Sequence, residues 1–323
     1  MKINTSAIVA VVAIGIAFPM QSVAQQWPDK NVRILVPFPP GGGTDIQARL
    51  LSTEFQKRMG QNFIIDNRTG ASGIIAAQLT VESPPDGNAI LFTSGSISVV
   101  ATLFAKQLKF DVYKDLQPVS WISSTPLVLS LHPSVPAKSV KELVTLAKRT
   151  SAGMNAGGNS SGSTAHLTAE MFNQTFGIKS TVLTYRGGGP AVIALISGEI
   201  DYIFATAPSI MPHLKTGKVN AIAVTTPKRS SVLPNLPTMS SIYPGFESDN
   251  WYAMFFPAGT PQEIVNKLNT AIRNALDAEE IKKFFQREAL EPVASSPAEL
   301  SAMLRREIEK YAKVIKAANI TVQ

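Results

Sequence analysis

Hydrophobic and polar positions alternate along the chain in a pattern that predicts strands followed by helices. A β-rich run at residues 32–36 ends in a Pro/Gly turn, and apolar residues from Ile46 to Met59 then recur at helical spacing until Gly60. Thr44 and Gln47 are spaced to form a capping box at the start of that helix. The stripe predicted to be buried consists of Ile46, Leu50, Leu51, Phe55 and Met59.

The rest of the chain continues the same alternation. Further strands are predicted at residues 63–65, 90–92, 181–183, 200–204, 221–224 and 251–256, and helices at 73–81, 139–149, 163–176 and 190–196. Thr260–Glu263 and Ser296–Glu299 each combine a capping box with a proline at the first helical position. Residues 119–131 are predicted as two extended runs broken at 123–126. Repeated strand–helix units imply α/β layers around mainly parallel sheets.

Composition limits the class of protein. The chain has 323 residues, 45% of them hydrophobic and 16% charged, which is enough for a large core and favours two domains. The chain has no cysteine, which excludes disulfide scaffolds, thiolate metal sites and cysteine nucleophiles. Its three histidines are widely spaced, which disfavours a zinc site. We therefore expect no cofactor. The net charge of +7 comes without a run of five basic residues, and nucleic acid is therefore not an expected partner.

The first 24 residues have the features of a secretory signal peptide. Lys2 gives a positive start, residues 8–18 form an apolar run, and Ser22-Val23-Ala24 is a small-x-small cleavage site. The run is too short to span a bilayer as a stable helix, and no later stretch reaches about 18 apolar residues. We expect a mature chain that begins near Gln25, is exported and does not insert into a membrane.

Three glycine-rich turns each follow a strand and precede a helix. They are residues 37–45, 157–166 and 185–190. Glycine lets the backbone approach a ligand closely, and free N–H groups at a helix start favour an anion. The first turn lacks the Gly-Lys-Ser/Thr of a P-loop and the Gly-x-Gly-x-x-Gly spacing of a dinucleotide site. Together the turns indicate one anionic ligand held by backbone and hydroxyls; the alternative is three structural turns, with Asp45 serving the helix dipole.

An enzyme is the competing interpretation. Residues 158–162 match the Gly-x-Ser-x-Gly nucleophile elbow at Ser160, and Asp201 and His213 follow in a permissible order. The elbow needs a strong buried strand before it, whereas residues 150–155 are polar and contain glycine. We expect no catalytic residues and keep a secreted serine hydrolase using Ser160 as the alternative. A transcription-regulator effector domain would need a DNA-binding helix pair where this chain has an export signal.

Over essentially the whole mature chain, a series of motifs resembles the Bug family, the substrate-binding proteins of tripartite tricarboxylate transporters. The motifs are Trp27-Pro28, Val36-Pro37-Phe38 with Pro40-Gly41-Gly42 and Asp45, Asp66-Asn67-Arg68, Gly162-Ser163 with His166-Leu167, Tyr185–Pro190, Gly198–Asp201 and Pro257–Pro261. Their order and spacing together are specific. Thr69, where the family often has Pro, and Ala205, where Asp is common, are departures that affect ligand identity more than fold.

The resemblance implies a two-lobe periplasmic-binding-protein fold of type II with two crossovers, each lobe being a mixed sheet flanked by helices. Residues 25–124 and 247–323 would form a discontinuous lobe 1, and residues 125–246 would form lobe 2. It also implies a non-catalytic periplasmic receptor that binds a small carboxylate between the lobes and delivers it to membrane transporter subunits. The family's ligands include di- and tricarboxylates, acidic amino acids, and aromatic acids such as terephthalate or nicotinate.

The resemblance also implies which residues contact the ligand. In lobe 1 these are Phe38, Gly41, Gly42, Gly43, Thr44 and Asp45, with Ser94 and Ser96 as further contacts. In lobe 2 they are Gly162, Ser163, Thr164, Tyr185, Arg186, Gly187, Gly188, Ala205 and Thr206. The sequence leaves open whether His166 and Trp251 are packing or pocket residues, and it favours a structural role for Asp201.

Overall fold

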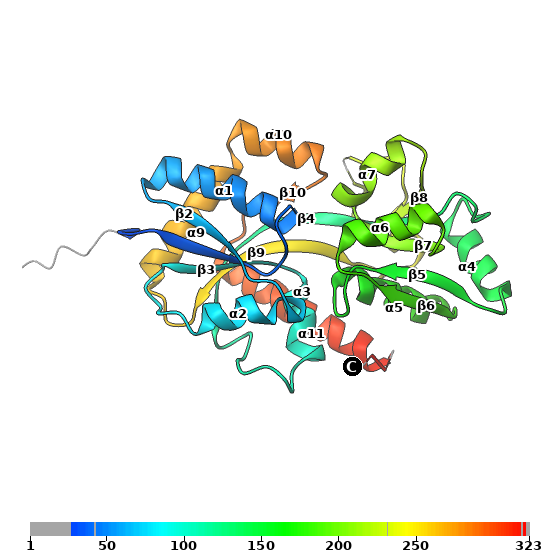
Figure 1. The fold of residues 1–323 in the computed structure, drawn as a ribbon, viewed down its shortest axis with the longest axis horizontal. Coiled ribbons are helices and arrows are strands. Elements are labelled where there is room, and N and C mark those ends of the chain that lie inside the picture. The colour runs from blue at the N-terminus through cyan, green and yellow to red at the C-terminus, as the bar shows by residue number, and fades with distance from the viewer. Residues whose placement is uncertain (1–26, 42, 231, 318, 321–323) are drawn as a thin grey trace, which may run out of the picture.

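Two α/β lobes lie side by side and are joined by two long strands (Figure 1). The structure is a computed structural model that describes residues 27–41, 43–230, 232–317 and 319–320. The predicted signal peptide and Gly42, one of the predicted ligand contacts, lie outside these residues.

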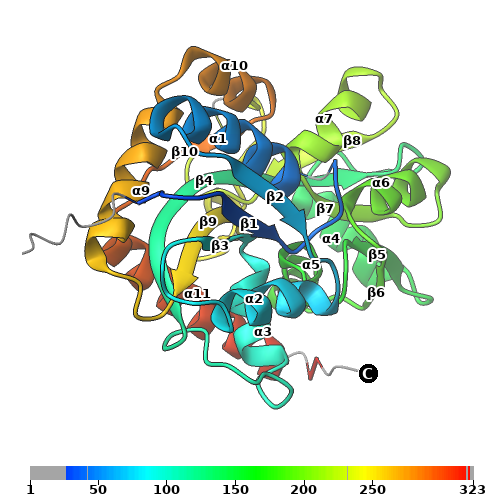
Figure 2. The same ribbon diagram turned by 60° about the vertical axis from the view of Figure 1, so that its left-hand side comes forward.

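Lobe 1 is built on a mixed sheet. Strand β1 (Val32–Val36) pairs in parallel with β2 (Phe63–Asn67) and β3 (Ala89–Ser94), and β3 pairs antiparallel with β9 (Asp249–Pro257). Figure 2 shows α1 (Gly43–Met59), α9 (Gln262–Leu276) and α10 (Glu279–Arg287) on one side of this sheet. Helices α2 (Ile74–Val81), α3 (Ser96–Leu103) and α11 (Pro297–Ala317) lie on the other side. The 3-10 turn η1 (Ala71–Gly73) contacts α2 and α3. Each side buries its own apolar cluster, one around Phe92 and the other around Trp251.

Lobe 2 repeats this layering. Strand β5 (Met154–Gly158) pairs in parallel with β6 (Ser180–Thr184) and β7 (Tyr202–Thr206), while β8 (Asn220–Val224) lies beside β4. The helices are α4 (Val140–Arg149), α5 (Thr164–Phe176), α6 (Gly188–Ser197), α7 (Ala207–Lys215) and α8 (Met239–Ile242). Phe172 of α5 is central to one buried cluster and Val192 of α6 belongs to the other, so this sheet too is covered on both faces.

A continuous strand, β4 (Leu116–Leu131), connects the lobes. Residues 116–126 pair with β9, and residues 127–131 pair with β7 and β8, so the order β2-β1-β3-β9-β4-β7-β5-β6 runs through both lobes, with the short β10 (Glu291–Pro292) also on β4. The predicted break at 123–126 is wrong, because these residues pair in register with residues 249–252. The boundaries at 124/125 and 246/247 remain our proposal for the limits of the lobes.

Helix α11 forms a third link between the lobes. It packs against α3 of lobe 1 and α5 of lobe 2, and the buried cluster between them contains Val99, Leu103, Leu167, Tyr311, Val314 and Ile315. Gln174 of α5 also donates from Nε2 to the Val314 carbonyl at 3.3 Å. The C-terminal helix therefore contacts both halves of the molecule.

Most predicted elements are confirmed, and two of the predicted capping boxes are wrong. Ser296 and Glu299 form their box, since Ser296 N–H donates to Glu299 Oε2 at 2.7 Å and Glu299 N–H donates to Ser296 Oγ at 3.3 Å. Thr260 Oγ1 instead donates to the Pro257 carbonyl at 2.8 Å, and α9 begins at Gln262 without a side-chain cap. The helices α3, α7, α8 and α10 were not anticipated.

The start of α1 also differs from the prediction. The helix already includes Gly43, and Gln47 donates from Nε2 to the Gly43 carbonyl at 3.2 Å while accepting from Ser123 Oγ at 2.7 Å. This contact with β4 turns Gln47 inward and leaves Ile46 exposed. The buried stripe therefore contains polar residues at its N-terminal end, where the first glycine-rich turn lies.

Candidate ligand-binding site

Asp45 holds the first glycine-rich turn in shape. Its side chain is buried; Oδ2 accepts from the Gly41 N–H and from Arg49 Nε, both at 2.9 Å, and Oδ1 accepts from Asn67 Nδ2 at 3.0 Å. The same Asn67 nitrogen donates to the Phe38 carbonyl at 3.0 Å. Burial alone would raise the pKa of Asp45, but these hydrogen bonds outweigh burial and hold its pKa below the usual range. Asp45 therefore stays ionised and paired within the turn.

Tyr252 of β9 lies at the N-terminus of α1. A Cβ at Gly43 would be 3.1 Å from Tyr252 Oη, which places the phenol directly beside the first residue of the helix. Burial raises the pKa of Tyr252 to about 12, although a hydrogen bond with Asn250 acts in the opposite direction. The hydroxyl is therefore neutral at physiological pH, and with the first N–H groups of α1 it forms a group of uncharged donors. No local sequence motif marks Tyr252 as a site residue.

The second glycine-rich turn is organised by Ser163 and His166. Ser163 caps α5, because its Oγ accepts from the N–H groups of His166 at 3.2 Å and Ser160 at 3.3 Å. The Gly162 N–H donates to His166 Nδ1 at 3.1 Å, and burial lowers the pKa of this histidine. His166 is thus a buried neutral residue that supports the turn. The two bonds to Ser163 occupy its lone pairs and leave its hydroxyl proton for another acceptor.

The N-termini of α3 and α5 meet at Gly95. The Gly95 N–H donates to the Trp251 carbonyl at 2.8 Å, and a Cβ at Gly95 would lie 3.0 Å from Trp251 Nε1 and 3.2 Å from Thr164 Oγ1. Thr164 Oγ1 donates to Asn250 Oδ1 at 3.4 Å. Among the described residues, the buried Trp251 Nε1 has no hydrogen-bond partner. An unpaired indole N–H therefore lies where a helix from each lobe begins.

Other predicted contacts lie next to this junction. Ser94 and Ser96 flank Gly95, are both buried, and have their hydroxyls 3.1 Å apart. Asn250 lies between the N-terminus of α1 and that of α5, since it contacts Thr164 of α5 directly and interacts with Tyr252, which lies beside α1. Residues 250 and 252 share one side of β9, and this alternation links the N-terminus of α1 to that of α5.

A direct hydrogen bond connects the lobes at Ser72. Its hydroxyl donates to the Ser161 carbonyl of the second turn at 2.8 Å. Residues 70–73 all have positive φ, and Ser72 itself has φ 54° and ψ 25°. A left-handed conformation at a residue other than glycine costs on the order of 1 kcal/mol or more. The segment is therefore held in a specific strained shape that presents Ser72 to lobe 2.

The third glycine-rich turn packs on the second. Gly187 N–H donates to the Asn159 carbonyl at 3.0 Å, and a Cβ at Gly188 would lie 3.2 Å from Ser209 Oγ and 3.7 Å from the Asn159 amide. Ser209 Oγ is 2.9 Å from Thr206 Oγ1, which stands at the end of β7. The predicted residues Gly187, Gly188 and Thr206 thus come together with Asn159 and Ser209, two polar residues that the sequence analysis did not select.

Three other lobe 2 candidates are placed differently. The Tyr185 hydroxyl donates to Glu199 Oε1 at 2.7 Å, and its pKa is raised to about 12 by burial and by this carboxylate. Arg186 is exposed, and Ala205 is buried in the core that also contains Val192. Asp201 accepts from the Asn155 N–H at 2.7 Å, which confirms the structural role expected for it.

Comparison with known proteins decides the family. The model of the tripartite tricarboxylate transporter family receptor matches residues 47–320. The chain belongs to this receptor family. BugT of Bordetella pertussis is 32% identical over 320 residues, which cover 97% of this chain and 98% of BugT. The family consists of substrate-binding receptors, so this protein is not an enzyme, and the hydrolase alternative at Ser160 is wrong.

Solved structures of receptors confirm the two-lobe fold. R. palustris Rpa4515 with adipate is 33% identical with a TM-score of 0.82, covering 91% of this chain and 99% of that protein. MatC (Rpa3494) from Rhodopseudomonas palustris with bound malate is 30% identical with a TM-score of 0.79, covering 90% and 100%. The periplasmic binding protein BugD is 27% identical with a TM-score of 0.81, covering 92% and 100%.

Neither a membrane-spanning helix nor a metal cluster is found in the described part of this receptor. None of its described helices is both long enough and apolar enough to cross a membrane. Within the same residues, no group of three or more His, Cys, Asp or Glu side chains is arranged to hold a metal ion.

Proposed function

We propose that this receptor captures a small dicarboxylate between its lobes in the periplasm and presents it to a tripartite tricarboxylate-type membrane transporter. The observation that carries the proposal is the pair of helix N-termini from opposite lobes, α1 beside Tyr252 and α5 beside Gly95, linked through Asn250. Adipate and malate, the ligands of two similar receptors, are both dicarboxylates and support the same ligand class.

The proposed site binds anions through uncharged donors. One carboxylate would meet the N–H groups of Gly43 and Thr44 and the Tyr252 hydroxyl; the other would meet the first turn of α5 with the free proton of Ser163. Each helix N-terminus carries a partial positive charge and therefore favours the ionised form of the ligand. Since neither lobe completes the site, binding would select the closed arrangement of the lobes.

The seventeen predicted contacts enter this proposal with different roles. Asp45 supports the first turn from behind, while Tyr185 is tied to Glu199 and Ala205 packs in the core. The remaining predicted residues stay proposed contacts, and Tyr252, Trp251, Asn159 and Ser209 join them.

Residues 1–24 support export, and N-terminal sequencing should find a mature chain that begins near Gln25. Recovery of the protein from the cytoplasm with Met1 intact would contradict this.

A thermal-shift screen over carboxylates, including adipate and malate, tests the ligand class. A ligand that binds only the folded state raises the melting temperature by mass action. Dicarboxylates should give larger shifts than monocarboxylates of the same length. Shifts confined to aromatic monocarboxylates or to tricarboxylates would contradict the proposed class.

Tyr252→Phe tests the proposed location. The variant removes one hydroxyl beside α1 and keeps the buried ring, so dicarboxylate affinity should fall about tenfold or more, the loss of a hydrogen bond to a charged group. Affinity equal to that of the unchanged protein would remove Tyr252 from the site.

A further inference from the structure

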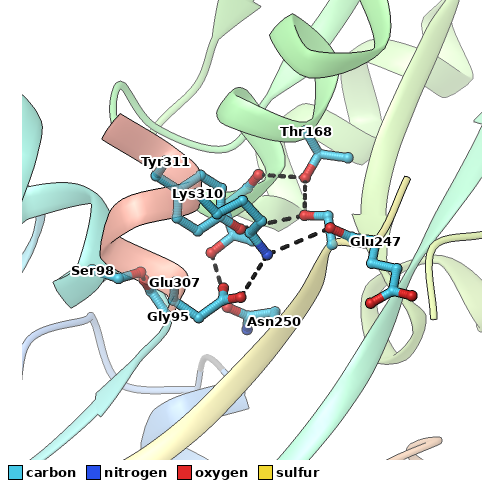
Figure 3. A network of polar contacts seen from close by, with 10 residues as sticks. Gly95, Ser98, Thr168, Glu247, Asn250, Glu307, Lys310 and Tyr311 are labelled. Carbon is cyan, nitrogen blue, oxygen red and sulfur yellow. Dashed lines mark hydrogen bonds and ion pairs between the residues drawn. The ribbon is translucent and has the colours of Figure 1, made fainter. Parts of the chain in front are cut away.

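A polar network joins the C-terminal helix to the segment that enters β9 (Figure 3). Lys310 Nζ donates to Glu307 Oε1 at 2.6 Å and to the Glu247 carbonyl at 3.4 Å. The next residue of the helix, Tyr311, has its hydroxyl 3.3 Å from Ser248 Oγ. Two consecutive residues of α11 thus hold two consecutive residues of the connection between the lobes.

The network continues into α5 through a chain of hydroxyls. Ser248 Oγ is hydrogen-bonded to Thr168 Oγ1, and Thr168 Oγ1 lies 2.7 Å from the Thr164 carbonyl. The side chains of Tyr311, Ser248 and Thr168 are all fully buried. The chain therefore runs from lobe 1 to the first residue of α5 without passing through solvent.

The last acceptor sets the direction of every proton in this chain. A carbonyl can only accept, so Thr168 must donate to Thr164, which leaves the Thr168 oxygen to accept from Ser248. Ser248 has then used its only proton, and its oxygen accepts from the Tyr311 hydroxyl. Aligned hydrogen bonds of this kind polarise one another in a low-dielectric interior.

We infer that Tyr311, Ser248 and Thr168 are positioning residues that fix the first turn of α5 for ligand binding. The inference rests on the proposed function, in which that turn receives one carboxylate of the ligand. Thr164 connects the network to the proposed site: its carbonyl ends the hydroxyl chain, and its side chain lies at the junction with Gly95 and Asn250. Without the Tyr311 hydroxyl, this chain of hydrogen bonds loses its anchor on α11, and the first turn of α5 is held less firmly.

Tyr311→Phe tests this inference, with Tyr202→Phe as the matched control. Tyr202 is also fully buried, and its hydroxyl donates to Asn173 Oδ1 at 2.9 Å within the core of lobe 2. Both variants lose one buried hydrogen bond, so the two should lose similar stability in urea unfolding. Only Tyr311→Phe should weaken adipate or malate binding, by about three- to tenfold and mainly through faster dissociation, whereas Tyr202→Phe should stay within about twofold.

A second pair of variants separates positioning from packing. Thr168→Ser keeps the hydroxyl and should retain the affinity of the unchanged protein, whereas Thr168→Val keeps the shape and should reproduce the loss. The inference is overturned if the unchanged protein binds a dicarboxylate but Tyr311→Phe and Tyr202→Phe bind it with equal affinity. Equal affinities of Thr168→Val and Thr168→Ser would overturn it as well. Either result would leave the proposed function standing. If the unchanged protein binds none of the carboxylates tested, the proposed function falls and this inference falls with it.

Discussion

Replacing Asp45 by asparagine should destabilise the protein and weaken ligand binding together. The carboxylate accepts hydrogen bonds from the Gly41 N–H, the Arg49 guanidinium and the Asn67 amide. Asparagine has nearly the same shape but only one oxygen, and its NH2 group would face one of these donors. At least one donor in the first glycine-rich turn would then lack its partner.

The magnitude follows from the burial of each partner. Leaving a buried donor without an acceptor costs about 1–3 kcal/mol. The ion pair with Arg49 adds little, about 1 kcal/mol at most, because the Arg49 side chain is 53% exposed. We expect a loss of about 2–3 kcal/mol at pH 7 and a several-fold weaker dicarboxylate affinity, because the turn that presents Gly43 loses its support.

The contribution of Asp45 to the free energy of unfolding should depend on pH. The pKa of Asp45 is lower in the folded state than in the unfolded chain, so its stabilisation is fully present above the unfolded value of about 4 and is lost as pH falls through the folded value. Urea unfolding followed by circular dichroism should therefore show that the free energies of unfolding of the unchanged protein and of Asp45→Asn converge below about pH 4.

Asp66→Asn is the matched control for Asp45→Asn. Asp66 pairs with Arg33 at 2.7 Å and Arg68 at 2.8 Å, and both arginine side chains are about half exposed. Its loss should cost no more than about 1 kcal/mol. Equal losses for the two variants would refute the bracing role of Asp45. Unchanged stability with weaker binding in Asp45→Asn would make Asp45 a direct ligand contact instead.

Three further substitutions test other parts of the account. Gly95→Ala places a methyl 3.0 Å from Trp251 Nε1, so isothermal titration should show dicarboxylate affinity reduced about tenfold or more, and unchanged affinity would contradict the junction site. Ser72→Ala removes the bond to the Ser161 carbonyl and should accelerate ligand release in stopped-flow measurements; an unchanged rate would show that this bond does not hold the lobes together. Burial raises the pKa of Asp249 to about 6, so the folded state binds its proton more tightly than the unfolded chain and stability should fall as pH rises from about 4 to 6. Asp249→Asn should therefore be more stable than the unchanged protein by about 1–3 kcal/mol at pH 8 and equal to it near pH 4, and no gain at pH 8 would contradict this pKa.

Local sequence signals predicted those parts of the site that depend on neighbours along the chain. The caps at Ser163 and Ser296 were readable because donor and acceptor are three residues apart. The glycine-rich turns were readable because each lies between a strand and a helix. The Thr260 box failed because α9 begins at Gln262 with Pro261 as its N-cap, so Thr260 lies one residue too early to cap the helix.

The residues that the sequence analysis missed depend on pairing between distant segments. Tyr252 lies at the start of α1 only because β9 pairs with β3 in a register that places Tyr252 opposite Ser94. The Ser-Ser-Thr-Pro run at 123–126 carries the local signature of a break, but its pairing with β9 keeps it extended. Strand registers and the contacts of α11 are tertiary features, and a single sequence offers no spacing from which to infer them.

The central claim is that a dicarboxylate is held at both ends by helix N-termini from opposite lobes. Isothermal titration should compare the best dicarboxylate of the screen with its mono-amide, while X-ray scattering follows the radius of gyration. The account predicts that the mono-amide binds at least about tenfold more weakly, a loss of about 1.4 kcal/mol, and that the dicarboxylate compacts the protein. Equal affinities, or dicarboxylate binding without compaction, would contradict it.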